Sequence, residues 1–238
     1  MNRRTFLKGL LFISSIFTFK LSASSKNNFS FDYGVASGDP TNTNVIIWTR
    51  VTSSINKDIK IKWQLSSNRS FTNILNSGIA LAKFSNDFTI KVDVNIPSAF
   101  RGKKVFYRFF INNTFSDVGM TKTLPVDNPD QYNIAFCSCS NHPAGYFNAY
   151  REMANNDEID LVLHLGDYIY EYDKDGYATE DSERFNRVVD PKHEIISLND
   201  YRERHAQYKS DSDLQALHRS KPMIVVWDDH EFTNDSWK

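Results

Sequence analysis

Hydrophobic and polar residues alternate along the first half of the chain in short runs. Four of these runs are rich in β-branched and aromatic residues, and they lie at 45–51, 59–65, 88–94 and 105–111. Alternation with a period of two is typical of strands that bury one face. Turn residues separate the runs, among them Ser37–Pro40, Asn68 and Asn112–Asn113. Because no long helical pattern interrupts the runs, residues 29–124 are predicted to form a β-sandwich.

The pattern changes after residues 125–131, a polar segment with two prolines that is predicted to be a linker. Beyond it, three apolar runs are predicted to be buried strands, and they lie at 133–138, 161–165 and 223–227. Helical patterns separate these strands along the chain. Strands that alternate with helices predict a parallel α/β sheet in residues 132–238.

Two segments between these strands carry apolar residues at helical spacing. The first is 144–155, and the second begins after Ser197, a plausible N-cap, and presents Leu198, Tyr201 and Tyr208 on one face. The charged segment 173–190 has no clear period. It is predicted to be a long loop over the site.

Potential metal ligands follow all three predicted strands. They belong to the segments Phe136–Asn141, Gly166–Glu171 and Trp227–Glu231. In parallel α/β sheets, ligands bind beyond the carboxyl ends of the strands. Asp167 follows Gly166, which lets the chain turn while the carboxylate points out of the sheet. The sequence therefore predicts one metal cluster at one edge of the sheet.

The chain contains two cysteines, Cys137 and Cys139, too close in sequence for an unstrained disulfide. Cys139 ends a predicted strand and is the thiolate candidate, whereas Cys137 lies inside the strand as a small core residue. Tyr170 comes three residues after Asp167 and is either a ligand at the same point or an aromatic lid. A thiolate together with a phenolate would favour ferric iron.

Four polar residues, Asp228–Glu231, follow the third strand. Because residues after a strand splay, only some of them face the site, and we expect Asp229 as a ligand and His230 as a proton donor or charge stabiliser. Asn234 is either a neutral oxygen ligand or a turn residue. A polar loop without a metal is the alternative for the whole segment. His164, within a strand, is expected to be a core residue.

Composition limits the classes of function. The chain has 238 residues, 40% of them hydrophobic, and a net charge of −1, so it has enough apolar material for a sizeable core. The basic run Arg101–Lys104 is isolated and is interpreted as a solvated loop. Neither feature predicts a surface specific for nucleic acid.

The first 25 residues have the pattern of a targeting segment. Asn2–Lys8 carries a twin arginine, Gly9–Phe19 is an apolar stretch too short to span a bilayer, and Leu21–Ser25 supplies small residues for cleavage. We expect a signal read by the Tat export machinery, hence a periplasmic or secreted protein. An uncleaved N-terminal anchor is the alternative.

Together, the motifs resemble the PhoD-type alkaline phosphatases, within the calcineurin-like metallophosphoesterases. In the second half of the chain, the matching segments are Phe136–Cys139, Gly145–Tyr150, His164–Glu171, Tyr201–Arg204, Ala206–Lys209, Asp213–Ala216 and Trp227–Glu231. In the first half, Tyr33–Pro40 and Val45–Arg50 resemble the N-terminal immunoglobulin-like or fibronectin III-like domain of that family.

The resemblance implies a metallophosphoesterase fold and a ferric ion with calcium as cofactors. The ferric ion would be held by Cys139, Asp167 and Tyr170. Asp167 would bridge to calcium, with Asp229 and Asn234 as further ligands. The implied reaction is hydrolysis of phosphate monoesters, and of diesters as a second class, by a metal-activated water, with His230 as the active-site histidine.

Family members continue well beyond the length of this chain. We therefore expect the α/β domain to be an incomplete, N-terminal half that lacks a C-terminal segment with further metal ligands. Such a chain is a fragment, a truncated product or one piece of a split phosphatase. Two alternatives are a catalytically inactive exported remnant whose sandwich is a binding module, and a metallohydrolase that acts on another ester.

Overall fold

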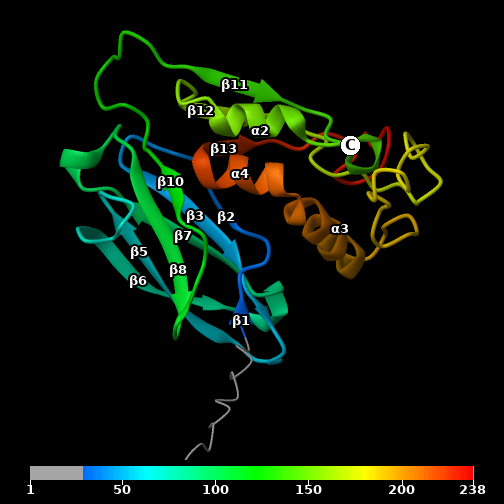
Figure 1. Cartoon of the computed structure of the whole chain (residues 1–238), viewed down its shortest axis with the longest axis horizontal. Helices are drawn as coiled ribbons and strands as arrows, with labels where there is room; N and C mark the ends of the chain where they lie inside the picture. Colours follow the sequence, from blue (N-terminus) through cyan, green and yellow to red (C-terminus); the bar gives the residue numbers. More distant parts are fainter. Residues whose placement is uncertain (1–28, 238) are drawn as a thin grey trace, which may run out of the picture.

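The computed structural model of the chain describes residues 29–237 (Figure 1). The expected signal at 1–25 lies outside the described residues. Within the described part, a small sheet pairs β1 (Phe29–Ser30) with β4 (Thr52–Ser53), and two larger sheets carry the fold. No helix among the described residues is long and apolar enough to cross a membrane.

One of the larger sheets is antiparallel and has the order β10–β8–β5–β6, with β9 paired to β8. Its strands are β5 (Ile59–Ser66), β6 (Ile74–Ala82), β8 (Val105–Ile111), β9 (Thr114–Phe115) and β10 (Gly119–Thr121). The predicted strands 59–65 and 105–111 are confirmed. Strand β6 was not predicted from the sequence, because its polar and apolar residues do not alternate regularly.

The other large sheet is mixed and has the order β11–β12–β13–β2–β3–β7. Its strands are β2 (Val35–Gly38), β3 (Asn44–Arg50), β7 (Thr89–Asn95), β11 (Ile134–Cys137), β12 (Leu161–His164) and β13 (Pro222–Val225). Strands β11, β12, β13 and β2 are parallel, and β2, β3 and β7 are antiparallel. The predicted parallel arrangement of the three strands after residue 132 is confirmed.

The antiparallel sheet shares one hydrophobic core with strands β2, β3 and β7 of the mixed sheet. Side chains at alternate positions of β3, β5 and β8 are fully buried in it, and they include Val45, Ile47, Ile61, Leu65, Tyr107 and Phe109. Alternation along each strand sends every second side chain to the same face. The period-two pattern in the sequence therefore predicted correctly that such strands bury one face.

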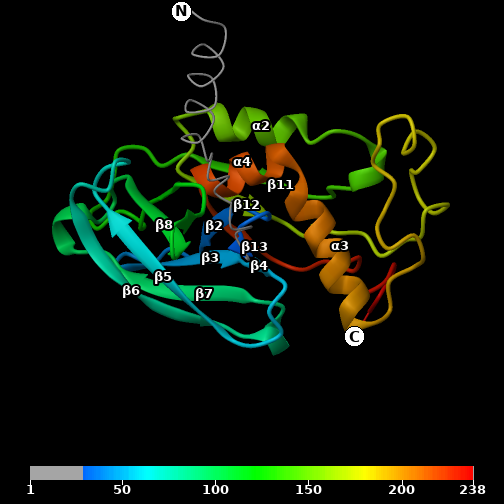
Figure 2. The same cartoon turned by 60° about the horizontal axis from the view of Figure 1, so that its bottom comes forward.

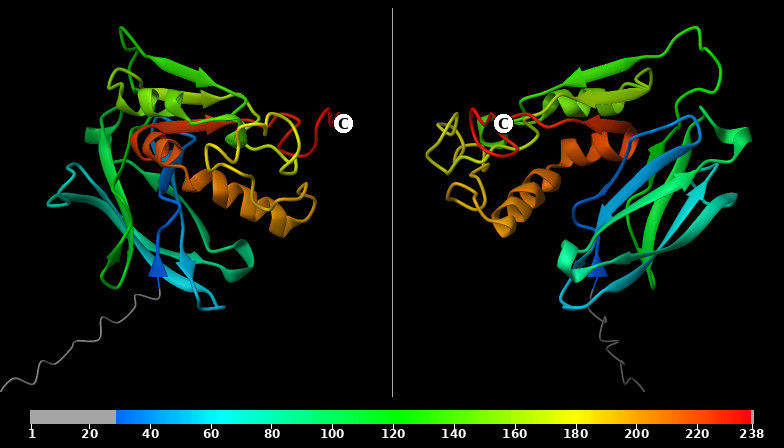
Figure 3. Two further views of the ribbon diagram at one scale, coloured as in Figure 1. Left: turned by 45° about the vertical axis from the view of Figure 1, so that its right-hand side comes forward. Right: turned by 180° about the vertical axis from the view of Figure 1, so that it is seen from behind.

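Three helices accompany the parallel strands: α2 (Asn148–Asn155), α3 (Leu198–Ser210) and α4 (Ser212–Ser220) (Figures 1 and 3). A second hydrophobic core joins α2, α3 and α4 to β12 and β13. Ser197 caps α3 in a capping box with Asp200, as expected of an N-cap. Helix α4 was not predicted; Asp211 caps it by accepting from Asp213 N and Leu214 N.

The helix predicted from residue 144 begins later. A 3₁₀ turn, η3 (His142–Ala144), comes first, and the backbone then extends at Gly145 before α2 starts. Two further 3₁₀ turns, η1 (Phe84–Asn86) and η2 (Ser98–Phe100), lie in the first half of the chain. The charged segment 173–190 contains neither helix nor strand, which confirms the predicted loop.

Ser37 and Gly38 are strand residues, which corrects their assignment to a turn. Strand β2 runs parallel to β13, with Ser37 opposite Pro222 and Gly38 opposite Met223. A Cβ on Gly38 would lie 2.5 Å from the Met223 carbonyl oxygen, so glycine here permits a close approach between strands. The sheet thus continues from the second half of the chain into the first (Figure 2). The division at residues 125–131 stays a prediction.

Candidate metal centre

Backbone contacts hold together the three loops that follow β11, β12 and β13. Cys139 N donates to Gly166 O at 3.1 Å, and Ser140 N donates to Asp167 O at 3.0 Å. Gly166 has a φ of 106°, and a Cβ there would lie 2.5 Å from Asp228 Cβ. A side chain at this position would push the third loop away. The glycine is therefore required for the three strand ends to meet.

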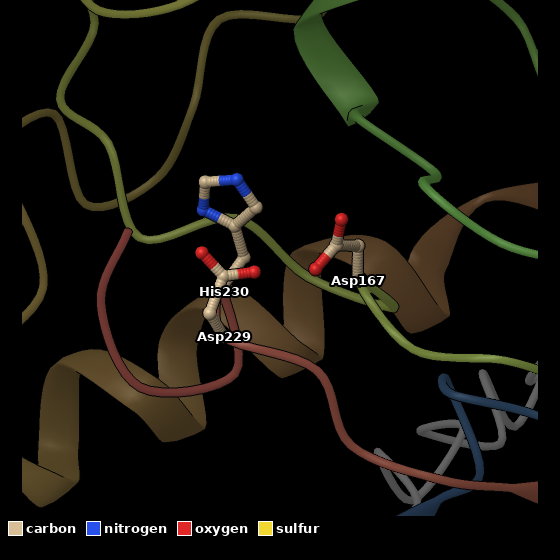
Figure 4. Close-up of side chains that lie close together, drawn as sticks. All are labelled: Asp167, Asp229 and His230. Carbon is tan, nitrogen blue, oxygen red and sulfur yellow. The ribbon is translucent and has the colours of Figure 1, made fainter. Parts of the chain in front are cut away.

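Asp167, Asp229 and His230 converge at this edge of the sheet (Figure 4). One potential ligand atom from each of the three side chains lies within 4.8 Å of the others. The first carboxylate comes from the loop after β12, and the other two side chains come from the loop after β13. The structure thus brings together three of the six residues predicted for the site in a group that could hold a metal ion.

The backbone and side chain of Asp167 both fit a ligand role. Its φ is 52°, and that of Cys139 is 59°, a left-handed conformation that is uncommon for residues other than glycine. Such conformations gather at functional sites, where surrounding structure holds them. The Asp167 side chain is buried, and its Oδ1 has no hydrogen-bond partner among the described residues. A buried carboxylate oxygen without a partner fits coordination to a cation.

Tyr170 lies against the same group. Its hydroxyl donates to Asp167 Oδ2 at 3.3 Å, and its ring lies 4.3 Å from that of His230 between centroids. Burial raises the pKa of Tyr170, and the nearby Asp167 and Cys139 side chains raise it further. The interaction with Cys139 places that side chain beside the phenol. A cation would have to supply the charge that favours the phenolate here.

Asp229 and Asn234 belong to the turn that closes the third loop. Asp229 Oδ2 accepts from Asp235 N at 2.5 Å, and this bond, with a contribution from His230, lowers the pKa of Asp229. The Asn234 side-chain amide nitrogen donates to Asp235 Oδ2 at 3.1 Å. Asn234 is outside the group of three, and its role as a ligand stays a prediction.

Two glutamates organise the site and were not among the predicted residues. Glu171 accepts from His230 Nδ1 at 2.8 Å, and Glu231 accepts from backbone N–H groups in two of the loops. Glu231 could have been found from its position three residues after Asp228. At that spacing a glutamate can accept a hydrogen bond from the backbone N–H of the earlier residue. For Glu171, no local signal exists, since His230 is distant in sequence.

A buried layer of polar side chains lies beneath the site. His164 is fully buried, as expected of a core residue, and its Nε2 pairs with Tyr150 Oη at 2.9 Å. Burial lowers the pKa of His164 to about 4. Tyr168, next to Asp167, is held by His218 Nε2 at 2.7 Å from its hydroxyl. Through Tyr168, this layer holds the residue next to Asp167 in place.

Two family models match the chain. The PhoD-like phosphatase model matches residues 134–238, and the model of the PhoD-like phosphatase N-terminal domain matches residues 18–125. The chain belongs to the PhoD-like phosphatase family. The resemblance found in the sequence motifs is thereby confirmed.

Comparison with individual PhoD-like phosphatases agrees with the family models. Alkaline phosphatase D from Bacillus subtilis (strain 168) is 38% identical over 237 residues, which cover 95% of this chain and 40% of the relative. A solved structure described as "Structure of PhoD" is 39% identical and superposes with a TM-score of 0.81, covering 88% of this chain and 41% of that chain. The chain therefore has the PhoD fold with its N-terminal domain and spans about two fifths of the length of these relatives.

Proposed function

We propose that this chain forms part of a metal-dependent phosphatase that hydrolyses phosphate monoesters, with diesters as a second class of substrate. The observation that carries the proposal is the convergence of Asp167, Asp229 and His230 at the carboxyl edge of the parallel strands. The similarity to alkaline phosphatase D supports a phosphoric ester hydrolase over an exported binding module.

The donor set supports two cations of different character. Cys139, Asp167 and Tyr170 combine a thiolate, a carboxylate and a phenolate, a set suited to Fe3+. Asp167, Asp229 and the amide oxygen of Asn234 are oxygen ligands, as Ca2+ requires. Asp167 would contribute to both sets, since its Oδ1 has no hydrogen-bond partner in the part of the chain that the structure describes. When bound, the cations would neutralise phosphate oxygens and lower the pKa of a water nucleophile.

The chain's own residues supply orientation and a proton donor. The carboxylate of Glu171 accepts from His230 Nδ1 at 2.8 Å, which fixes the imidazole and leaves Nε2 as the nitrogen that acts on substrate. With Nδ1–H donating to Glu171, Nε2 carries a proton only in the imidazolium form, and in that form it donates to a phosphate oxygen or gives its proton to the leaving oxygen, where negative charge develops. The ring of Tyr170 packs on this imidazole and covers one face of it.

Two finer features of the fold belong to the same proposal. We infer that the two facing sheets of residues 29–124 form an immunoglobulin-like or fibronectin III-like sandwich, and that β11, β12 and β13 belong to a calcineurin-like metallophosphoesterase fold. The shared core of the facing sheets and the position of Asp167, Asp229 and His230 at the strand ends support this inference.

The proposal includes the place where the protein acts. The twin-arginine pattern in residues 2–8 supports Tat export to the periplasm or medium.

The test uses the full-length protein with p-nitrophenyl phosphate and bis-p-nitrophenyl phosphate as substrates. Asp167→Asn should retain the fold, and its kcat/KM should fall by more than about 100-fold. Removing a supporting partner of a metal ligand usually lowers activity by about 10–100-fold, and removing the ligand itself should lower it further. Asp181→Asn is the matched control, since Asp181 is exposed in the 173–190 loop. Full turnover in Asp167→Asn would contradict the proposal. Metal analysis of the purified protein should find iron and calcium.

A further inference from the structure

Glu231 joins two of the three strand-end loops through a single carboxylate. Its Oε2 accepts from Asp167 N at 3.1 Å and from Asp228 N at 2.7 Å. Its Oε1 accepts from Tyr168 N. The side chain therefore binds three backbone N–H groups, two in the loop after β12 and one in the loop after β13. The two loops that it joins are those that provide Asp167, Asp229 and His230.

The contact explains how Asp167 keeps an unfavourable backbone conformation. With a φ of 52°, Asp167 lies in the left-handed region, which costs a non-glycine residue energy. This conformation turns the N–H groups of Asp167 and Tyr168 toward one point, the kind of concavity that binds an anion. The Glu231 carboxylate occupies that point. A negatively charged acceptor is the group that stabilises such a pair of donors best.

We propose that Glu231 is a positioning residue that sets the direction of the Asp167 carboxylate toward the cations, without binding them itself. The inference rests on the proposed function and goes beyond it by assigning this role to a residue outside the ligand set. Both Glu231 oxygens are engaged by backbone donors, and this separates its role from that of Asp167, whose Oδ1 has no partner among the described residues.

Glutamine at this position tests the role closely. The side chain of Glu231→Gln has the same length, but one oxygen is replaced by an NH₂ group, which would face a backbone donor instead of accepting from it. At least one of the three bonds is lost, and so is the negative charge. Glu203→Gln is the matched control, because Glu203 is exposed on α3 and bonds Asn199.

The first readout is metal binding by the full-length protein. Fe3+ is titrated into metal-free wild type, Glu231→Gln and Glu203→Gln, and the visible absorption of the tyrosinate–iron pair reports on Tyr170. Glu231→Gln should bind Fe3+ about 10–100-fold more weakly, as supporting partners of metal ligands usually do. Excess Fe3+ should restore the absorption, since the ligands remain. Wild-type affinity for Fe3+ in Glu231→Gln would overturn the inference. A loss of the absorption that excess Fe3+ does not restore would also overturn it, because Glu231 would then be a metal ligand.

The second readout is hydrogen exchange of the metal-free protein at residues 166–169. Exchange of the Asp167 and Tyr168 amides should be faster in Glu231→Gln than in wild type, and unchanged in Glu203→Gln. Unchanged exchange in Glu231→Gln would overturn the inference, because the carboxylate would not hold the loop. If wild type binds no metal and releases no phosphate, the proposed function fails and the inference fails with it. If wild type binds metal and releases phosphate, and Glu231→Gln matches it in both readouts, the inference alone fails.

Discussion

The carboxylate of Glu171 accepts a hydrogen bond from His230 Nδ1 at 2.8 Å. Its second oxygen accepts from the backbone N–H of Asn234 at 2.6 Å, and the side chain is almost fully buried. One carboxylate thus ties the loop after β12 to the loop after β13. It also decides which imidazole nitrogen faces the site, because a carboxylate can only accept and Nδ1 must therefore donate.

Replacing Glu171 by glutamine should lower turnover by about 10–100-fold, the usual effect of removing a partner that orients an active-site group. KM should change little, because in the proposed mechanism Glu171 orients His230 and binds no part of the substrate. Steady-state kinetics of the full-length protein at several substrate concentrations would separate the two parameters. Glu180→Gln, in the exposed loop, is the control. Equal losses in both variants would contradict the orienting role of Glu171.

Stability should fall on acidification because His164 is buried in its neutral form. Burial lowers its pKa to about 4, below the value in an unfolded chain. The unfolded state therefore binds more protons between pH 6.5 and 4, and the free energy of unfolding decreases as pH falls through that window. A shift of this size corresponds to about 3 kcal/mol.

Denaturant unfolding at pH 7, 6, 5 and 4.5 would measure this dependence. In His164→Gln, the decrease should be smaller than in wild type, since glutamine does not titrate and its amide can still pair with Tyr150. His193→Gln is the control, because the His193 side chain is 65% exposed. An identical pH dependence in wild type and His164→Gln would show that other groups cause the acid sensitivity.

Truncating a side chain of β5 that is buried between the two large sheets should lower stability. Truncating an exposed side chain of β6 should leave stability nearly unchanged. Ile61 is fully buried, whereas Ile79, on the adjacent strand, is 63% exposed. Ile61→Ala should lower the free energy of unfolding by about 2–5 kcal/mol. Ile79→Ala should change it by less than about 0.5 kcal/mol. Chemical denaturation of both variants is the measurement, and similar losses would contradict the assignment of the core face.

The ion pair between Arg187 and Asp211 should anchor the 173–190 loop. Their side chains are more than nine-tenths buried, and the two groups lie 2.6 Å apart. Asp211 also caps α4, so Arg187→Gln leaves a buried capping carboxylate without its cation, which costs about 3–5 kcal/mol. The loop should then be cleaved faster by a protease.

Arg184→Gln provides the comparison for this loop. Arg184 pairs with Asp181 at 3.3 Å, but their side chains are 74% and 56% exposed. Such surface pairs contribute at most about 1 kcal/mol. Limited proteolysis should therefore distinguish the two arginine variants. Equal cleavage rates in Arg187→Gln and wild type would mean that the loop is held by other contacts.

Local patterns predicted the elements that depend on neighbours in sequence. The alternation at 59–65 and 105–111 identified β5 and β8, and Ser197 was recognised as the N-cap of α3. The same reasoning failed at Ser37 and Gly38. A serine and a glycine before Asp and Pro have the composition of a turn, but pairing with β13 makes them part of a strand.

The sequence by itself determined which residue types follow each strand, and hence that the ligand candidates gather at one edge of a parallel sheet. Tertiary structure decided how each one is held. Glu171 and His230 are 59 residues apart, and Glu231 reaches an N–H group 64 residues away. No periodicity, capping or turn preference reports on such pairs, because those signals come from interactions within a few residues. The pairing of distant loops follows from the packing of the whole sheet and its helices.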